Sequence, residues 1–206
     1  MTTRWRVGVD PDALSRAVEV LRSGGLVAYP TDTVYGIAAD PRSDLAIDRV
    51  FALKGRDPGT AVPLIASDTA QAMAAGDFGP RELRLAEAFW PGPLSIVVPA
   101  KPMVSRTVLG QRNSVALRVP AHVVARQLAA AFGFCITATS ANPSGDAPAE
   151  AADRVIEILP DVDLVLDAGP APGGLPSTIV ALDNDGPVLV RAGAIAWDRV
   201  IKLLLQ

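Results

Sequence analysis

Residues 24–40 read Gly-Gly-Leu-Val-Ala-Tyr-Pro-Thr-Asp-Thr-Val-Tyr-Gly-Ile-Ala-Ala-Asp, and the helix-like run that follows ends at Lys54-Gly55-Arg56. We expect a buried strand over residues 26–29 that Pro30 ends, because proline cannot donate to a sheet ladder. Small hydroxyl and carboxylate side chains follow at once, at residues 31–33. Open α/β sheets bind their ligands at strand ends, so this stretch predicts a polar, partly cationic crevice.

The chain has 206 residues, of which half are apolar and a fifth are charged. Such a chain can bury one large hydrophobic core, and we predict a single domain over residues 1–206. Its core would extend from about residue 10 to residue 196, with a C-terminal helix over residues 197–205. The formal net charge of −3 argues against binding nucleic acid through bulk positive charge, although a local basic groove stays open.

The chain has one cysteine, Cys135, and one histidine, His122. These counts exclude a disulfide within the chain and a zinc site of the usual ligand types. The N-terminus lacks the apolar segment of a signal peptide, and no apolar run reaches the roughly 18 residues that span a bilayer. We therefore expect a cytoplasmic protein without a membrane partner.

Apolar periodicity and turn residues divide the chain into alternating strands and helices. Helices are expected over residues 10–22, 81–90, 121–132, 149–159 and 197–205, and two more begin at residue 43 or 44 and at residue 68. Strands are expected over residues 26–29, 62–66, 94–99, 114–119, 134–138, 163–167, 177–182 and 188–191. Some strands follow each other through short turns, which predicts a twisted, mixed parallel and antiparallel sheet flanked by helices, an α/β fold.

The first two helices carry apolar stripes that we expect to face the core. Asp10 would cap the first helix, with Pro11 at its first position. The stripe of the first helix consists of Leu14, Ala17, Val18 and Leu21. The stripe of the second consists of Leu45, Ile47, Val50, Phe51 and Leu53.

Lys54 and Arg56 flank a glycine at or just past the end of the second helix. Lysine supplies a point charge and arginine a planar fork, so the pair suits a polyphosphate. The pair also fits a solvated helix end, where cations oppose the helix dipole. The chain has no glycine-rich run followed by Lys-Ser or Lys-Thr, which excludes a Walker loop.

Two further polar segments lie at the ends of predicted strands. Thr139-Ser-Ala-Asn142 comes directly after the strand over residues 134–138, and Ser177 follows the glycine pair 173–174. Hydroxyl and amide groups there can bond a ligand, or can form an Asx or Ser/Thr turn. Arg118 and Arg191 end two strands, where isolated arginines are mostly surface ion pairs.

Together these segments form an ordered series along the chain. Its members are residues 29–36, Lys54-Gly-Arg56, Trp90-Pro-Gly-Pro-Leu94, Arg118-Val-Pro120, Thr139-Ser-Ala-Asn142, Pro176-Ser-Thr-Ile-Val180 and Arg191-Ala-Gly193. With this series, which covers about residues 14–195, the chain resembles the YrdC-like family of L-threonylcarbamoyladenylate synthases. The Lys-x-Arg and Ser-x-Asn pairs are the signature elements of the resemblance.

The resemblance implies a YrdC-like fold with a large basic cavity. It implies an enzyme that joins L-threonine, bicarbonate and ATP to give threonylcarbamoyl-AMP and pyrophosphate, for threonylcarbamoyl modification of tRNA. Threonine would be contacted by Thr33, Arg118, Ser140 and Ser177. ATP would be held by Lys54, Arg56, Asn142 and Arg191, with Lys54 and Arg56 as the catalytic pair.

The resemblance also implies Mg²⁺ bound with ATP, with Asp32 as a candidate protein ligand, and neither zinc nor an organic cofactor. The partner would be the machinery that transfers the threonylcarbamoyl group to tRNA, with RNA contact as an open option. Two positions depart from the family pattern. Ser67 stands where the family often has a threonine-holding histidine, after a loop two residues longer, and Glu150 replaces a common serine or threonine.

Two other functions remain open. A double-stranded RNA-binding or tRNA-binding module could use the same basic crevice, although the acidic composition and the lack of interleaved aromatic residues argue against it. A carbamoyl-adenylate enzyme like the related domain of hydrogenase-maturation proteins is the third interpretation. Those proteins carry further domains with cysteine-rich fingers, and this chain has neither.

Overall fold

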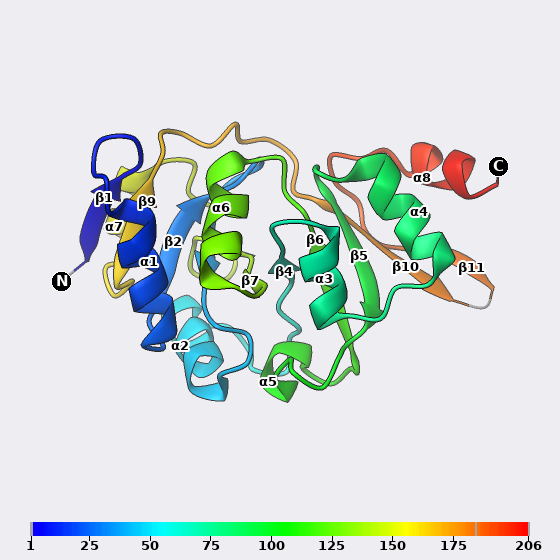
Figure 1. The fold of residues 1–206 in the computed structure, drawn as a ribbon, viewed down its shortest axis with the longest axis horizontal. Coiled ribbons are helices and arrows are strands. Elements are labelled where there is room, and N and C mark those ends of the chain that lie inside the picture. The colour runs from blue at the N-terminus through cyan, green and yellow to red at the C-terminus, as the bar shows by residue number, and fades with distance from the viewer. Residues whose placement is uncertain (1, 184, 206) are drawn as a thin grey trace.

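The computed structural model describes residues 2–183 and 185–205, whose strands form two mixed sheets side by side (Figure 1). In spatial order, the first sheet consists of β1 (Thr3–Arg6), β9 (Leu164–Asp167), β2 (Val27–Pro30), β3 (Tyr35–Ala38) and β8 (Thr139–Ser140). The second consists of β11 (Gly186–Arg191), β10 (Thr178–Asp183), β5 (Leu94–Pro99), β6 (Ser114–Arg118), β4 (Leu64–Ile65) and β7 (Ile136–Thr137). The expected mixture of parallel and antiparallel pairs is confirmed, but it is divided between two sheets rather than held in one.

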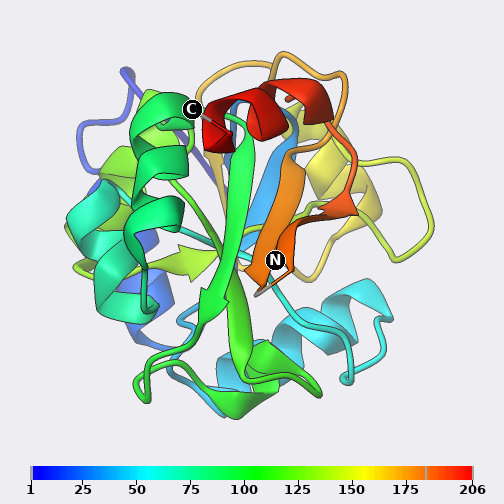
Figure 2. The ribbon, with the colours of Figure 1, turned by 90° about the vertical axis from the view of Figure 1, so that its right-hand side faces the viewer.

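Helices pack on both sheets. On the first sheet lie α1 (Ala13–Arg22), α6 (Val123–Phe132) and α7 (Ala152–Ile158). Below them in Figure 1, α2 (Asp44–Lys54) packs on the short α5 (Arg106–Leu109). The remaining helices are α3 (Thr69–Ala75), α4 (Pro80–Phe89), which packs on β5, and α8 (Trp197–Leu204). Figure 2 shows α8 across the top of the second sheet, where it contacts α4.

The chain crosses from the second sheet to the first at Ala138, the single residue between β7 and β8. Thr137 joins the sheets just before this crossing. Its hydroxyl donates to the carbonyl of Ile37 at 2.8 Å and accepts from the amide of Ala39 at 2.8 Å. The side chain of Thr137 is fully buried, so these bonds form without competition from water. One extended segment therefore belongs to both halves of the molecule.

The turn after β2 differs from the prediction. Pro30 is the last residue of β2 and pairs with Tyr35, the first residue of β3, in an antiparallel hairpin. A strand over residues 35–38 was not expected. The hydroxyl of Thr31 donates to the carbonyl of Val34 at 2.7 Å and so closes the turn between the two strands.

The helix starts and stripes are partly confirmed. Ser43 caps α2 as expected, accepting from the amide of Ala46 at 3.3 Å. α1 begins at Ala13, because the carboxylate of Asp10 accepts from the amide of Arg6 instead of capping the helix. The prediction that Leu45 faces the core is wrong, since this side chain is 79% exposed, and Leu14 is only partly buried.

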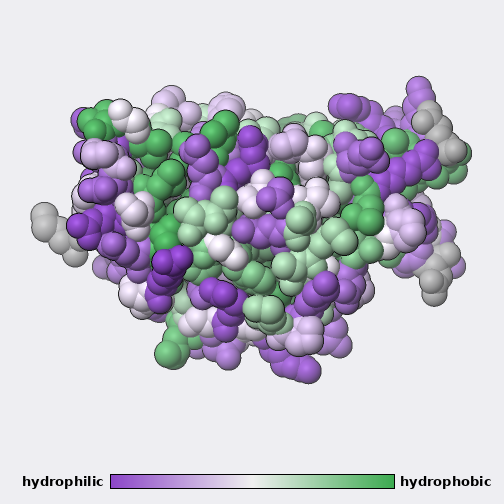
Figure 3. All heavy atoms as spheres, viewed as in Figure 1, coloured by the Kyte–Doolittle hydropathy of each residue, from purple (hydrophilic) through white to green (hydrophobic). Residues whose placement is uncertain are grey.

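Two further elements, β1 and α5, also lie where none was expected. The hairpin of β10 and β11 forms as predicted, with the carboxylate of Asp183 accepting from the amides of Asp185 and Gly186. Asn184 of the predicted turn lies outside the described residues. Hydrophilic and apolar residues are interspersed over the face in Figure 3. Within residues 2–183 and 185–205, every helix is too short or too polar to span a membrane.

Candidate functional site

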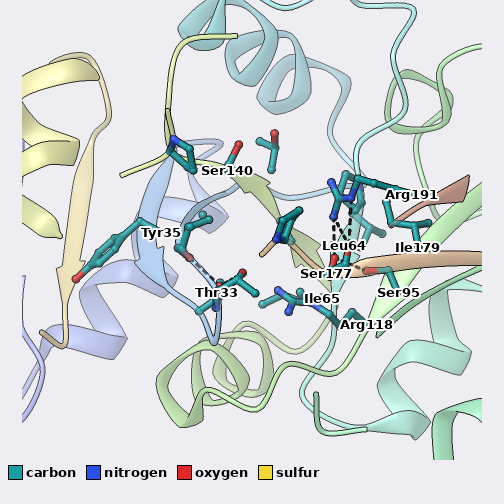
Figure 4. Close-up of a pocket in the computed structure, with 18 of the residues that line it drawn as sticks. Thr33, Tyr35, Leu64, Ile65, Ser95, Arg118, Ser140, Ser177, Ile179 and Arg191 are labelled. Atoms are coloured by element: carbon teal, nitrogen blue, oxygen red, sulfur yellow. Dashed lines mark hydrogen bonds between the residues drawn. The ribbon is translucent and has the colours of Figure 1, made fainter. Parts of the chain in front are cut away.

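A cavity of about 480 Å³ lies where the two sheets meet (Figure 4). Its wall is built from the β2–β3 hairpin, the loop after α2, the β7–β8 crossing and the start of β10. The polar residues of the wall are Thr31, Thr33, Tyr35, Arg56, Ser95, Arg118, Thr139, Ser140, Ser177 and Arg191. A cavity of this size suits a small-molecule ligand.

The β2–β3 turn brings two hydroxyl groups to the wall. The hydroxyls of Thr31 and Thr33 lie 3.0 Å apart, and both residues are buried. The carbonyl of Thr33 accepts from the amide of Gly173 at 2.8 Å, which ties the turn to the glycine-rich loop before β10. Tyr35 points away from the cavity in Figure 4, toward the carbonyl of Gly169, to which its hydroxyl donates at 2.7 Å.

The side chains of Lys54 and Arg56 take different directions, because Gly55 between them ends α2 in the left-handed conformation, with φ of 57°. Arg56 lies on the cavity wall, where its guanidinium donates to the hydroxyl of Thr139 at 3.1 Å and to the carbonyl of Ala61 at 2.9 Å. Burial lowers the pKa of Arg56, because a charge removed from water loses solvation. An anion in the cavity would compensate that loss.

Lys54 is buried beneath Ser140. It is not among the described residues that line the cavity. Its ammonium donates to the carbonyls of Ser140 and Asn142 at 2.5 and 2.6 Å. Burial, followed by the nearby charge of Arg56, lowers the pKa of Lys54 to about 8. Asn142 is buried too, and its amide group donates to the carbonyls of Pro143 and Asp146.

Arg118 enters the cavity from the end of β6. Its guanidinium donates to Asp32 Oδ1 at 2.9 Å, and the side chains of both residues are about nine-tenths buried. Asp32 Oδ2 and His122 Nδ1 are the buried side-chain atoms without a hydrogen-bond partner in the described part of the chain. Burial lowers the pKa of His122, and the charge of Asp32 opposes that shift.

Arg191 closes the cavity from the end of β11. Its guanidinium donates to the carbonyl and the hydroxyl of Ser177, at 2.8 and 2.9 Å, as the dashed lines in Figure 4 show. The hydroxyl of Ser177 lies 3.1 Å from that of Ser95. Burial and then the charge of Arg118 lower the pKa of Arg191, so two cationic groups face the same space.

The wall therefore contains three arginines, and none of its described residues is acidic. Asp32 compensates one of the three charges from outside the wall. Such a surplus of positive charge in a partly buried space favours an anionic ligand. The hydroxyl groups of Thr33, Ser140 and Ser177 add short, directional hydrogen-bonding groups beside the arginines.

The cavity contains six of the eight residues singled out from the sequence, namely Thr33, Arg56, Arg118, Ser140, Ser177 and Arg191. Lys54 and Asn142 stand behind it. Sequence reasoning placed Thr31 in the polar crevice without giving it a ligand, and it missed Ser95, whose only signal was its place directly after the segment 90–94. The loop over residues 57–67 reaches the cavity through Ala61 and Pro63, whereas the hydroxyl of Ser67 bonds the carboxylate of Asp68.

The described cavity wall has no carboxylate that could bind a metal ion. No group of three or more His, Cys, Asp or Glu side chains that could hold a metal occurs in residues 2–183 and 185–205. Asp32, the candidate Mg²⁺ ligand, pairs with Arg118 through Oδ1, and its Oδ2 is buried without a hydrogen-bond partner outside the described cavity wall. The side chains present therefore do not fit a protein-held Mg²⁺ in the cavity.

The fold and site define an α/β protein with a cationic ligand cavity between two mixed sheets. Over residues 19–193 the chain matches the Sua5_yciO_yrdC family model, described as "Telomere recombination", and it belongs to that family. It is 35% identical over 190 residues to threonylcarbamoyl-AMP synthase of Pyrococcus abyssi, covering 91% of this chain and 56% of that one. It is 40% identical over 175 residues to threonylcarbamoyl-AMP synthase of Chromohalobacter salexigens, covering 84% and 94%.

The structure is also similar to that of Sua5 from P. abyssi complexed with L-threonine. The TM-score is 0.91 at 32% identity, and the match covers 98% of this chain and 60% of that one. The chain thus spans little more than half the length of the P. abyssi protein, whereas it spans nearly all of the C. salexigens relative.

Proposed function

We propose that this protein is an L-threonylcarbamoyladenylate synthase. The observation that carries the proposal is the convergence of Arg56, Arg118 and Arg191 with three hydroxyl groups on a cavity wall free of acidic residues in the described chain. All three substrates carry negative charge, namely the carboxylate of L-threonine, the triphosphate of ATP and bicarbonate itself. Similarity to proteins named threonylcarbamoyl-AMP synthase supports the same assignment.

The reaction has two bond-forming steps. The amine of L-threonine attacks the carbon of bicarbonate, and loss of water gives the carbamate. A carbamate oxygen then attacks the α-phosphorus of ATP, and the bond to pyrophosphate breaks, which leaves threonylcarbamoyl-AMP. No protein nucleophile is needed, because holding the reactants together and neutralising the phosphates lowers the barrier.

The cavity charge also favours a reactive amine. Only a neutral amine can attack bicarbonate, and nearby cations lower the pKa of an ammonium group. Arg118 and Arg191 therefore promote loss of the proton from bound threonine, without a histidine in the described wall. Arg118 takes the carboxylate of threonine, beside the hydroxyls of Thr33, Ser140 and Ser177, while Arg56 and Arg191 face the phosphates.

Mg²⁺ would enter with ATP and be held by phosphate oxygens, since the cavity wall supplies no carboxylate in its described residues. The consumer of the product would be the tRNA threonylcarbamoyl-transfer machinery, in the cytoplasm. An RNA-binding module finds less support, because the arginines lie inside a cavity and Tyr35 points away from it.

The test is pyrophosphate release by the purified protein. We expect release that requires L-threonine, bicarbonate and ATP together, and that falls at least a hundredfold in the Arg56→Met variant. Arg16→Met is the matched control, because Arg16 lies on the exposed face of α1, paired with Glu19. Pyrophosphate release at the same rate without threonine would refute the proposal.

A further inference from the structure

The ammonium of Lys54 is surrounded by oxygen atoms of one loop. It donates to the carbonyl of Ser140 at 2.5 Å, to the carbonyl of Asn142 at 2.6 Å and to Asn142 Oδ1 at 3.5 Å. The main chain makes a fourth link, since the carbonyl of Lys54 accepts from the amide of Ser144 at 2.7 Å. The end of α2 is thus attached to residues 140–144 by side chain and backbone together.

A lysine ammonium has three N–H donors and no acceptor. Two donors of Lys54 are taken by short bonds to backbone carbonyls, the third has Asn142 Oδ1 at 3.5 Å, and the residue is only 4% exposed. Binding a phosphate would require Lys54 to give up at least one of these bonds and leave a buried carbonyl without its donor. An unpaired buried polar group is costly, because it has lost its hydrogen bonds to water without gaining a protein partner.

The loop around Lys54 is itself closed. The side-chain amide of Asn142 donates to the carbonyls of Pro143 and Asp146, so its oxygen is turned toward the ammonium. The loop faces the cavity with Ser140, whereas Asn142 stays buried beside Lys54. The Ser-x-Asn pair therefore has one residue toward the ligand and one toward the lysine.

We propose that Lys54 is a positioning residue, which gathers the carbonyls of residues 140 and 142 and so sets Ser140 and the Thr139–Arg56 contact in place. It makes no contact with phosphate. The two cations of Lys54-Gly55-Arg56 thus have different tasks, and only Arg56 faces the ligand. The identity of the ligands used below rests on the proposed function, whereas the position of Lys54 does not.

Comparing nucleotides with one, two and three phosphates shows whether Lys54 positions the loop or binds phosphate directly. Binding of L-threonine, AMP, ADP and ATP to the wild type, Lys54→Met and Arg56→Met is measured by calorimetry. We expect Lys54→Met to weaken AMP, ADP and ATP by the same factor, about tenfold, and to weaken L-threonine as well. Arg56→Met should weaken ATP more than AMP.

Two results would overturn the inference: a loss in Lys54→Met that grows from AMP to ATP, or wild-type affinity for all four ligands. If the wild type itself binds neither threonine nor ATP, the proposed function fails instead. Should Lys54→Met not fold, the wild type provides a second test, because the chain has only three lysines. The ¹⁵N signal of the Lys54 ammonium should keep its position when AMP is exchanged for ATP, and a shift that grows with each phosphate would contradict the inference.

Discussion

Arg118 and Asp32 form a buried ion pair at the edge of the cavity, with 2.9 Å between the guanidinium and Asp32 Oδ1. A buried ion pair is weak evidence for stability, since an apolar pair of similar size often stabilises a protein as much. Its effect here is geometric, because one nitrogen of Arg118 is held and the rest of the guanidinium faces the ligand space.

Replacing Asp32 tests this geometric role. Asp32→Asn keeps the shape and an acceptor oxygen but removes the charge that orients Arg118. We expect the KM for L-threonine to rise about tenfold, or about 1.4 kcal/mol, with a smaller change in kcat. Steady-state kinetics measure both. Asp40→Asn is the control, because Asp40 pairs with Arg42 at the surface, and equal effects in the two variants would contradict the orienting role.

Removing a cavity charge should change the pH dependence of catalysis. Arg191→Gln lowers the positive potential, so the pKa of the bound threonine amine rises and the acid limb of kcat moves to higher pH. A charge at this range changes a pKa by about one unit. Arg191→Lys keeps the charge and should keep the limb near its wild-type position. The profile is recorded as kcat at saturating substrates, and an unmoved limb in Arg191→Gln would argue against the electrostatic activation of threonine.

The hydrogen bonds by which Thr137 joins the two sheets should contribute to the stability of the protein. Thr137→Val removes two buried hydrogen bonds and leaves the amide of Ala39 and the carbonyl of Ile37 without that partner. We expect the free energy of unfolding to fall by roughly 2–3 kcal/mol in urea titrations. Thr60→Val, in an exposed loop, should change it by less than about 0.5 kcal/mol. A loss below 1 kcal/mol in Thr137→Val would mean that the link is weak.

The single cysteine reports on unfolding. Cys135 is fully buried, and burial raises the pKa of its thiol to about 12. Because the thiolate is the reactive form, iodoacetamide at pH 8 should leave the native protein unlabelled and label it fully in urea. Mass spectrometry measures the labelling, and rapid labelling of native protein would show that this part of the core opens.

Much of the fold could be predicted from local patterns. β5 has the bounds that its apolar run predicts, and α3, expected to begin at residue 68, starts at Thr69 with Asp68 as its cap. The strands that were missed or misplaced are those whose pairing depends on distant partners. β3 connects β2 to the distant β8, and the two-residue strands β7 and β8 place Ile136–Thr137 in one sheet and Thr139–Ser140 in the other.

The residues of the cavity were also predictable in part. Residues that come soon after predicted strands, such as Thr33 and Ser140, do meet at one cavity. The direction of Lys54 was not predictable, because it depends on the left-handed turn at Gly55 and on carbonyl groups 86 and 88 residues further along the chain. Side-chain type and spacing specify which groups are near, whereas backbone acceptors decide which of them remain free for a ligand.

The fate of the bicarbonate carbon decides whether the protein makes threonylcarbamoyl-AMP. Wild-type protein is incubated with ¹³C-bicarbonate, L-threonine and ATP. The products are separated, and their masses are measured by mass spectrometry. We expect threonylcarbamoyl-AMP that carries one ¹³C, formed together with an equal amount of pyrophosphate and greatly reduced in Arg56→Met. Release of pyrophosphate or AMP without any ¹³C-labelled adenylate would contradict it.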